Sequence, residues 1–301
     1  MMRDGFAHSP VQPEWLNPIV DIGALAECAP PLCLTGDFSQ KRQICSLLTE
    51  KHAMNQKVFV AGAAGAVGSV LVPMLIGAGY TVYGTTRRAE RAQQLEAAGA
   101  IAVIVDVFDR VALAEALKRS GAQHVLHQLT DLPPALDPAQ MERAVGHNAR
   151  IRDEGTRNLV DAALAAGCST IVAQSIAWAY APGAQPYVET QPLDLQAEGK
   201  RGVSVRGVSA LETWVLDTPP LVGTVLRYGQ LYGPGTGFDA PQGVMPVHVE
   251  AAAHAALLAL RLGVSGIFNV AEDNAQVSSV KAQRLLGWDA GWRQVNRSHN
   301  R

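Results

Sequence analysis

The sequence predicts an α/β fold, a doubly wound parallel sheet that is followed by a small C-terminal lobe. Two observations carry this prediction. Between residues 58 and 227, short runs rich in β-branched and apolar residues alternate with segments of helical periodicity. The spacing leaves room for one crossover helix between successive strands, which parallel strands with right-handed connections require.

The strands are expected at 58–61, 81–84, 101–105, 124–127, 169–173 and 221–227. The helices are expected at 66–78, 89–98, 109–118, 141–166 and 205–216. Pro73 should bend the first helix because it removes one backbone hydrogen bond, and Asp109 should cap the third. Later in the chain we expect a turn at 233–235, a helix at 248–262, a strand at 266–270 and a final helix at 278–286.

The chain is expected to divide into three parts. Residues 1–53 are rich in proline and show little periodicity, so we expect a poorly ordered extension, with Met54 as the functional start. The alternative is an ordered segment that covers a sheet edge or a partner subunit. Residues 54–235 should form the domain of the main sheet, including its sixth strand, and residues 236–301 the small C-terminal lobe.

The composition excludes several classes of protein. With 301 residues, 48% of them hydrophobic, the chain can bury a large core, and its net charge of −2 gives no basis for binding nucleic acid or a membrane surface. The uncharged run 58–86 contains six glycines and a proline, so it is interpreted as strand, helix and strand rather than a membrane span. Four scattered cysteines predict a reduced, cytoplasmic protein, and no metal-ligand spacing is present.

A glycine-rich turn follows the first strand. Gly62, Gly65 and Gly68 are spaced three apart, directly before the first helix. Glycine permits backbone angles that a Cβ would block, and it lets a phosphate approach the N–H groups at the positive N-terminus of the helix. This stretch therefore predicts a dinucleotide site.

Five further segments accompany this G-x-x-G-x-x-G spacing. They are Asp106-Val107, the G-T-R-N-L-V run at 155–160, L-R-Y-G-Q-L-Y-G-P-G at 226–235, H-V-E-A-A-A at 248–253 and L-L-G-W at 285–288. In this combination the chain resembles the extended and atypical short-chain dehydrogenases/reductases, specifically the NAD-dependent epimerase/dehydratase family. The resemblance implies a Rossmann-like fold, a homodimer and a small-molecule substrate. It also implies an NAD(P) site that includes Gly62, Gly65, Ala66, Val67, Gly68, Asp106, Val107, Leu129 and Tyr228.

The residues after the second strand bear on the choice of cofactor. An acidic side chain there would bind the ribose of NAD and repel the 2′-phosphate of NADP. This chain has Thr85, Thr86, Arg87 and Arg88 instead, and guanidinium groups suit a phosphate. We therefore predict NADP, with Thr86, Arg87 and Arg88 at the phosphate. NAD remains the alternative, in which both arginines belong to a solvated helix start.

The catalytic residues are where the chain departs from the family it resembles. That family uses a Ser or Thr after the fifth strand and a Tyr-x-x-x-Lys pair, whose cation lowers the pKa of the phenol. No Tyr-x-x-x-Lys occurs anywhere in the chain. Counting back from Glu212 puts Ser204 in the place of the tyrosine and Val208 in that of the lysine.

Other residues could take part in catalysis. Ser175 lies in or next to the Ser/Thr position and could hold a substrate oxygen, whereas Tyr180 and Tyr228 could supply a proton. Each of the three could equally be structural, as a strand-end cap or a packed aromatic. The short stretch between the turn at 233–235 and residue 248 further suggests a small or loosely held substrate.

Three functions therefore remain open at this point. The first is an NADP-dependent oxidoreductase or epimerase-like enzyme that acts on a small carbonyl or hydroxyl substrate. The second is a non-catalytic, NADP-binding redox sensor, and the third is a degenerate relative that serves as a partner subunit.

Overall fold

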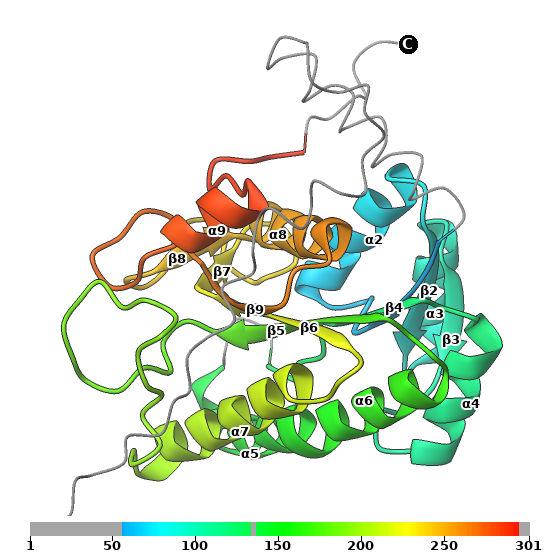
Figure 1. The fold of residues 1–301 in the computed structure, drawn as a ribbon, viewed down its shortest axis with the longest axis horizontal. Helices are drawn as coiled ribbons and strands as arrows, with labels where there is room; N and C mark the ends of the chain where they lie inside the picture. The colour runs from blue at the N-terminus through cyan, green and yellow to red at the C-terminus, as the bar shows by residue number, and fades with distance from the viewer. Residues whose placement is uncertain (1–55, 134–136, 295–301) are drawn as a thin grey trace, which may run out of the picture. The chain divides into compact units, whose positions relative to one another are not determined.

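The structure, a computed structural model, describes residues 56–133 and 137–294. The expected extension 1–53 and the proposed start at Met54 lie outside these residues. Seven parallel strands form the main sheet in the order β3-β2-β1-β4-β5-β6-β9 (Figure 1). They are β1 (Lys57–Ala61), β2 (Thr81–Thr86), β3 (Ile101–Ile104), β4 (His124–His127), β5 (Thr170–Ile176), β6 (Val222–Tyr228) and β9 (Gly266–Val270). The predicted doubly wound parallel sheet is confirmed.

Helices cover both faces of this sheet (Figure 1). One face carries α2 (Ala66–Gly77), α3 (Ala89–Ala97), α8 (Val249–Leu262) and α9 (Val280–Leu286). The other face carries α4 (Arg110–Ser120), α5 (Pro138–Arg150), α6 (Thr156–Ala165) and α7 (Gly199–Leu216). The predicted cap of α4 is confirmed, because the Asp109 carboxylate accepts a hydrogen bond of 3.0 Å from the N–H of Ala112. None of the helices in the described ranges is both long and apolar enough to cross a membrane.

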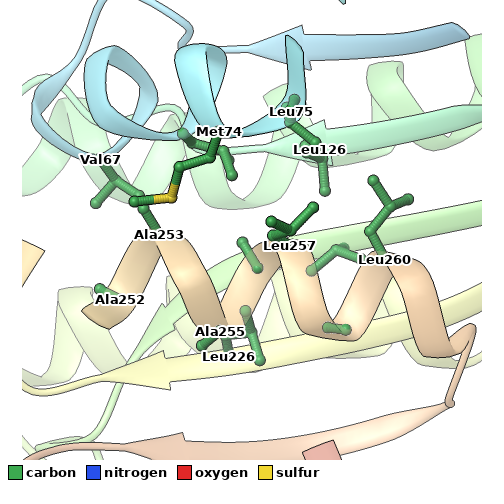
Figure 2. Close-up of a cluster of buried hydrophobic side chains, with 14 of the residues drawn as sticks. Val67, Met74, Leu75, Leu126, Leu226, Ala252, Ala253, Ala255, Leu257 and Leu260 are labelled. Carbon is green, nitrogen blue, oxygen red and sulfur yellow. The ribbon is translucent and has the colours of Figure 1, made fainter. Parts of the chain in front are cut away.

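The two cores follow from the alternation of side chains along the strands. Val58 and Val60 of β1 belong to the core under α2 and α8, whereas Phe59 belongs to the core under α6 and α7. Figure 2 shows how α8 packs in the first of these cores. Small side chains such as Ala252 and Ala255 and the longer Leu257 and Leu260 of α8 meet the side chains of α2 and of the strands.

The helix that was expected to run from 141 to 166 is not uniform. It begins earlier, with α5, and then passes through a π-helical turn, η3 (Ile151–Gly155), before it continues as α6. A π-helical turn accommodates an additional residue in the helix and changes the direction of the side chains around it, and such turns are frequent at functional sites. Helical periodicity in the sequence does not reveal this turn because its flanks remain regular.

The region after residue 235 contributes to the main sheet as well as to a separate ribbon. β9 pairs in parallel with β6, Val225 opposite Ile267, so it extends the sheet rather than belonging to an independent lobe. By contrast, β7 (Gln230–Tyr232) and β8 (Pro246–His248) form a two-stranded ribbon of their own. The expected boundary at residue 236 thus falls inside this ribbon, because strand pairing across the sheet outweighs sequence order.

Candidate functional site

A cleft of about 1110 Å³ opens at the carboxyl edge of the sheet. It is lined by the ends of β1, β2, β4, β5 and β6, by the loop after β3, and by residues of α5, η3 and α7. In doubly wound sheets ligands bind at this edge, where the strand order reverses between β1 and β4. The cleft is therefore the place to test the predicted site residues.

The glycine-rich turn forms the floor of the cleft, and a side chain at two of its glycines would clash with the backbone. Gly62 has a φ of +87°, and a Cβ there would lie 2.5 Å from the carbonyl oxygen of Gln128. A Cβ on Gly68 would lie 2.2 Å from the carbonyl oxygen of Gly62. Gly65 is the N-cap of α2, and neither a side-chain cap nor an acidic residue occupies the first turn of that helix. The positive end of α2 therefore faces the cleft without a counter-charge, together with the adjoining Ala66 and Val67.

Arginines line the end of β2. The hydroxyl of Thr86 accepts a hydrogen bond of 3.1 Å from the N–H of Arg88, and Arg87 lies 3.3 Å from the carboxylate of Asp131 across the cleft. Arg91, one helical turn further along α3, donates a 2.9 Å hydrogen bond to the carbonyl of Ala64 in the glycine-rich turn. Sequence reasoning missed Arg91, although its spacing of four residues from Arg87 on a predicted helix was a usable signal.

The predicted residues Asp106 and Val107 lie in the loop after β3, and this loop lines the cleft. The carboxylate of Asp106 accepts a 2.9 Å hydrogen bond from the N–H of Phe108, which shapes the loop after β3. The carbonyl of Val107 accepts a 2.9 Å hydrogen bond from Asn158, so the G-T-R-N-L-V segment holds this loop in place. Leu129 follows β4 and also lines the cleft.

Two polar groups in the cleft, the side-chain amide of Gln128 and the hydroxyl of Tyr228, are buried and interact with each other. Within the described residues neither makes a hydrogen bond of regular geometry. Both residues line the cleft, and a buried polar group without a partner is costly. These groups, the open helix N-terminus and the arginines together fit a dinucleotide with phosphate groups.

Ser175 lines the cleft, and its hydroxyl has a hydrogen-bond partner. The hydroxyl donates a 3.0 Å hydrogen bond to the carboxylate of Glu212 on α7, and the same carboxylate is held by Arg227 at 2.6 and 2.8 Å. This buried network raises the pKa of Arg227, since the contacts with Glu212 outweigh the effect of burial. The next residue on β5, Ile176, lines the cleft with an apolar side chain.

The structure separates the two candidate tyrosines. Tyr180 lies outside the cleft, where its hydroxyl donates a 2.7 Å hydrogen bond to Asn269 and its ring stacks on that of Tyr187 at 5.2 Å. Burial raises its pKa. Tyr228 does line the cleft, but burial raises its pKa as well, which makes it a poor proton donor near neutral pH.

The residues expected at the positions of the family's tyrosine and lysine, Ser204 and Val208, lie on α7. Ser204 is buried and lines the cleft, whereas Val208 is fully buried and packs with Ile176 and Val205. Among the described residues no lysine lines the cleft. The cation that does reach it from this side is Arg152 on η3, which sequence reasoning did not single out. Its position directly before the G-T-R-N-L-V segment was the available signal.

Nothing in the ranges 56–133 and 137–294 brings together three His, Cys, Asp or Glu side chains that could hold a metal ion. His127, the last residue of β4, is fully buried, and its Nε2 lies 3.0 Å from the hydroxyl of Thr156. Burial lowers its pKa to about 4, and the charge of Arg152 adds to the effect. A neutral structural histidine is the consistent interpretation.

Comparison with known proteins gives one family. The profile of the NAD dependent epimerase/dehydratase family matches residues 58–271. A 3-diazoavenalumate denitrifying reductase of a Streptomyces species is 37% identical over 273 residues, which cover 77% of this chain and 88% of the relative.

Two solved structures illustrate the likeness in fold. The UDP-glucose-4-epimerase of Stenotrophomonas maltophila, with bound NAD and formylated UDP-arabinopyranose, is 18% identical with a TM-score of 0.65, over 79% of this chain and 94% of that one. A dTDP-glucose 4,6-dehydratase of Streptomyces venezuelae, with NAD bound, is 17% identical with a TM-score of 0.63. The match covers 79% of this chain and 93% of the dehydratase. At this identity the likeness shows the fold alone.

Proposed function

The chain belongs to the NAD-dependent epimerase/dehydratase family, and from this premise we propose that it is an NADPH-dependent reductase that replaces the diazonium group of an aromatic substrate by hydrogen. The observation that carries the proposal is the cleft's chemistry on the side of α7. Counted back from Glu212, Ser204 and Val208 take the positions of the family's tyrosine and lysine, and Val208 packs with Ile176. The substrate class is suggested by the relative, whose name describes a denitrifying reduction of a diazo compound.

Reduction of a carbonyl and reduction of a diazonium group place different demands on an active site. A carbonyl oxygen that accepts a hydride becomes an alkoxide, so a proton donor such as an activated phenol is needed. An aryl diazonium ion that accepts a hydride gives the arene and dinitrogen: the C–N bond breaks, a C–H bond forms, and no proton is required. A site that lacks the tyrosine and lysine is therefore adequate for the second reaction.

Different residues of the cleft would hold different parts of the cofactor. The turn from Gly62 to Gly68 would hold the pyrophosphate at the N-terminus of α2, and Arg87, Arg88 and Arg91 would surround the 2′-phosphate of NADP. When bound, the reduced nicotinamide supplies a hydride. NADP rather than NAD is part of the proposal, because no acidic side chain follows β2 to bind the ribose.

The apolar wall of the cleft has a role of its own in this reaction. Aryl diazonium ions also lose dinitrogen to water and then give phenols. Ile176 and Trp178 line the cleft after β5, and their apolar side chains disfavour water at the reacting carbon. The protein's contribution is then to orient the ring and to exclude water rather than to transfer a proton.

The test measures whether deuterium from labelled NADPH is transferred to the aromatic product. The full-length protein is incubated with NADPH carrying deuterium at the transferable position and with diazotised 3-amino-4-hydroxycinnamate. We expect NADPH oxidation faster than without protein, dinitrogen release equimolar with NADPH consumed, and deuterium on the ring carbon that carried nitrogen. The Gly68→Ala variant, which should not hold the cofactor, controls for reduction in free solution.

Other outcomes separate the competing functions. Oxidation of NADPH by aldehydes or ketones but not by the diazonium compound would show a carbonyl reductase and contradict the proposal. Tight NADPH binding without oxidation by any of these compounds would instead support the non-catalytic sensor.

A further inference from the structure

Arg152 is a partly buried cation that lines the cleft. Within the described residues no carboxylate lies in ion-pairing distance of its guanidinium, and no hydrogen bond from its side chain is present. Burial lowers its pKa to about 10, while the charge of Glu212 acts in the opposite direction, so the group stays charged at neutral pH. Its N–H groups are therefore available to an anionic ligand that enters the cleft.

Each carboxylate near Arg152 already has a partner. Glu212 is bound by Arg227 through two hydrogen bonds of 2.6 and 2.8 Å. Glu154 pairs with Arg150 at 2.7 Å, and Asp153 accepts a hydrogen bond of 3.2 Å from Trp214. Glu212 and Glu154 are thus paired with other arginines, and Arg152 keeps its charge for a ligand in the cleft.

The position of Arg152 argues against a role at the cofactor's phosphates. It interacts electrostatically with His127 at the end of β4 and with Glu212 on α7. The glycine-rich turn follows β1 and the arginines Arg87 and Arg88 follow β2, whereas β4 lies on the other side of β1 in the sheet. Arg152 therefore belongs to the half of the cleft that the cofactor's phosphates do not occupy.

The cleft that Arg152 lines also offers apolar side chains that suit a planar ring. Ile176 and Trp178, which follow one another closely at the end of β5, line the same cleft, and Trp178 is 37% exposed. A guanidinium beside apolar walls favours a ligand that combines a carboxylate with an aromatic ring, because the fork of N–H groups matches a carboxylate. Desolvation strengthens such a pair.

We propose that Arg152 binds the carboxylate of an aromatic acid and so sets the orientation of the substrate in the cleft. This inference rests on the proposed function only in treating this half of the cleft as the substrate site. The π-helical turn has a direct part in it, because it is the element that carries Arg152. The neighbouring positions Asp153 and Glu154 make contacts outside the cleft.

The experiment is a calorimetric titration of the full-length protein loaded with NADP⁺. The probes are 4-hydroxycinnamate and its primary amide, which has the same shape without the charge. We expect the wild type to bind the carboxylate at least about 10-fold more tightly than the amide. Arg152→Gln should weaken binding of the carboxylate about 10- to 100-fold and leave the amide unchanged, as expected for loss of a charge-assisted contact. Arg152→Lys should retain part of the preference.

The matched control is Arg143→Gln. Arg143 lines the same cleft but is exposed on α5, so its removal should change either affinity by less than about 3-fold. Unchanged circular dichroism and NADPH affinity in Arg152→Gln would show that the variant is folded. The inference fails if the wild type binds neither probe or both equally, or if Arg152→Gln keeps the preference. It also fails if that variant loses NADPH affinity by the same factor.

These outcomes are independent of the reductase assay. A protein that prefers the carboxylate through Arg152 but oxidises no NADPH would support this inference and contradict the proposed reaction. If the wild type and Arg152→Gln reduce the diazonium compound equally well, the proposed reaction is supported and the role of Arg152 is contradicted.

Discussion

The hydroxyl of Ser175 donates a 3.0 Å hydrogen bond to the carboxylate of Glu212, which lies 37 residues later on α7. This contact joins β5 to α7 beneath the cleft and completes a buried network with Arg227. A hydroxyl with this partner supports the packing of the sheet edge. Its neighbours on β5, Gln174 and Ile176, line the cleft together with Ser175.

Ser175→Ala should therefore cost stability rather than activity. Losing one hydrogen bond to a charged, buried acceptor is expected to lower the free energy of unfolding by about 1–3 kcal/mol. The rate of NADPH oxidation with the diazonium compound should stay within about 2-fold of wild type. Urea unfolding and steady-state kinetics measure the two quantities, and a rate loss of about 100-fold or more would restore Ser175 as a catalytic residue.

Glu212→Ala should be much more damaging, because it leaves the guanidinium of Arg227 buried without a counter-charge. The expected loss is about 3–5 kcal/mol in the free energy of unfolding. Glu142→Gln is the control, since the 3.9 Å pair of Glu142 with Lys200 is exposed and should contribute less than about 1 kcal/mol. The double variant Glu212→Leu/Arg227→Met should recover much of the lost stability; if it is as unstable as Glu212→Ala, the explanation by an unpaired charge is wrong.

Gly68→Ala should abolish cofactor binding, because the added Cβ would lie 2.2 Å from the carbonyl oxygen of Gly62 and displace the turn. NADPH affinity, measured by fluorescence titration, is expected to fall by more than about 100-fold. The control is Gly146→Ala on α5, where no atom lies within 4 Å of the new Cβ. That variant should bind NADPH normally and gain up to about 1 kcal/mol of stability. Normal binding by Gly68→Ala would contradict the assigned turn.

Arg87→Ala and Arg88→Ala test the choice of cofactor. Each should weaken NADPH binding about 10- to 100-fold, because a charge-assisted contact to the 2′-phosphate is lost. NADH binding should change by less than about 3-fold, and Arg143→Ala should affect neither cofactor. Equal loss for NADPH and NADH would overturn the NADP preference. Titration of both cofactors at two salt concentrations measures the effect and its electrostatic part.

The stability of the protein should fall in mild acid through His127. Burial lowers its pKa from 6.5 to about 4, so between these values the unfolded chain binds a proton that the folded chain does not. The free energy of unfolding is then expected to decrease by about 3 kcal/mol as the pH falls from about 6.5 to 4. His254, whose pKa burial also lowers to about 4, acts in the same direction. Urea unfolding at several pH values gives the free energy of unfolding as a function of pH. This free energy should depend less steeply on pH for His127→Gln than for wild type, and an equal dependence would contradict the assignment to His127.

Much of the fold could be predicted from the sequence because its signals are local. The strand at 124–127 and the start of the helix at 89 agree with the structure to the residue, and Gly62 and Gly68 were recognised by spacing alone. Such features depend on the residues next to them, on periodicity, caps and backbone angles. The same holds for the family, since its motifs are short and ordered along the chain.

The direction of side chains in the site could not be predicted in this way. Only the packing of α7 against β5 decides that the hydroxyl of Ser175 meets Glu212 and that Ile176 packs with Val208. Tyr180 was a reasonable candidate until its hydroxyl was seen on Asn269, which is 89 residues away in the chain.

By itself, therefore, the sequence determined the order of strands and helices, the glycine-rich turn and the family to which the protein belongs. The tertiary structure decided that β9 joins the main sheet, and that a π-helical turn carries Arg152, a cation without a partner among the described residues, into the cleft. The physical reason is the same in both cases. Backbone conformation is set by neighbours in the chain, whereas pairing, burial and charge balance are set by residues that only folding brings together.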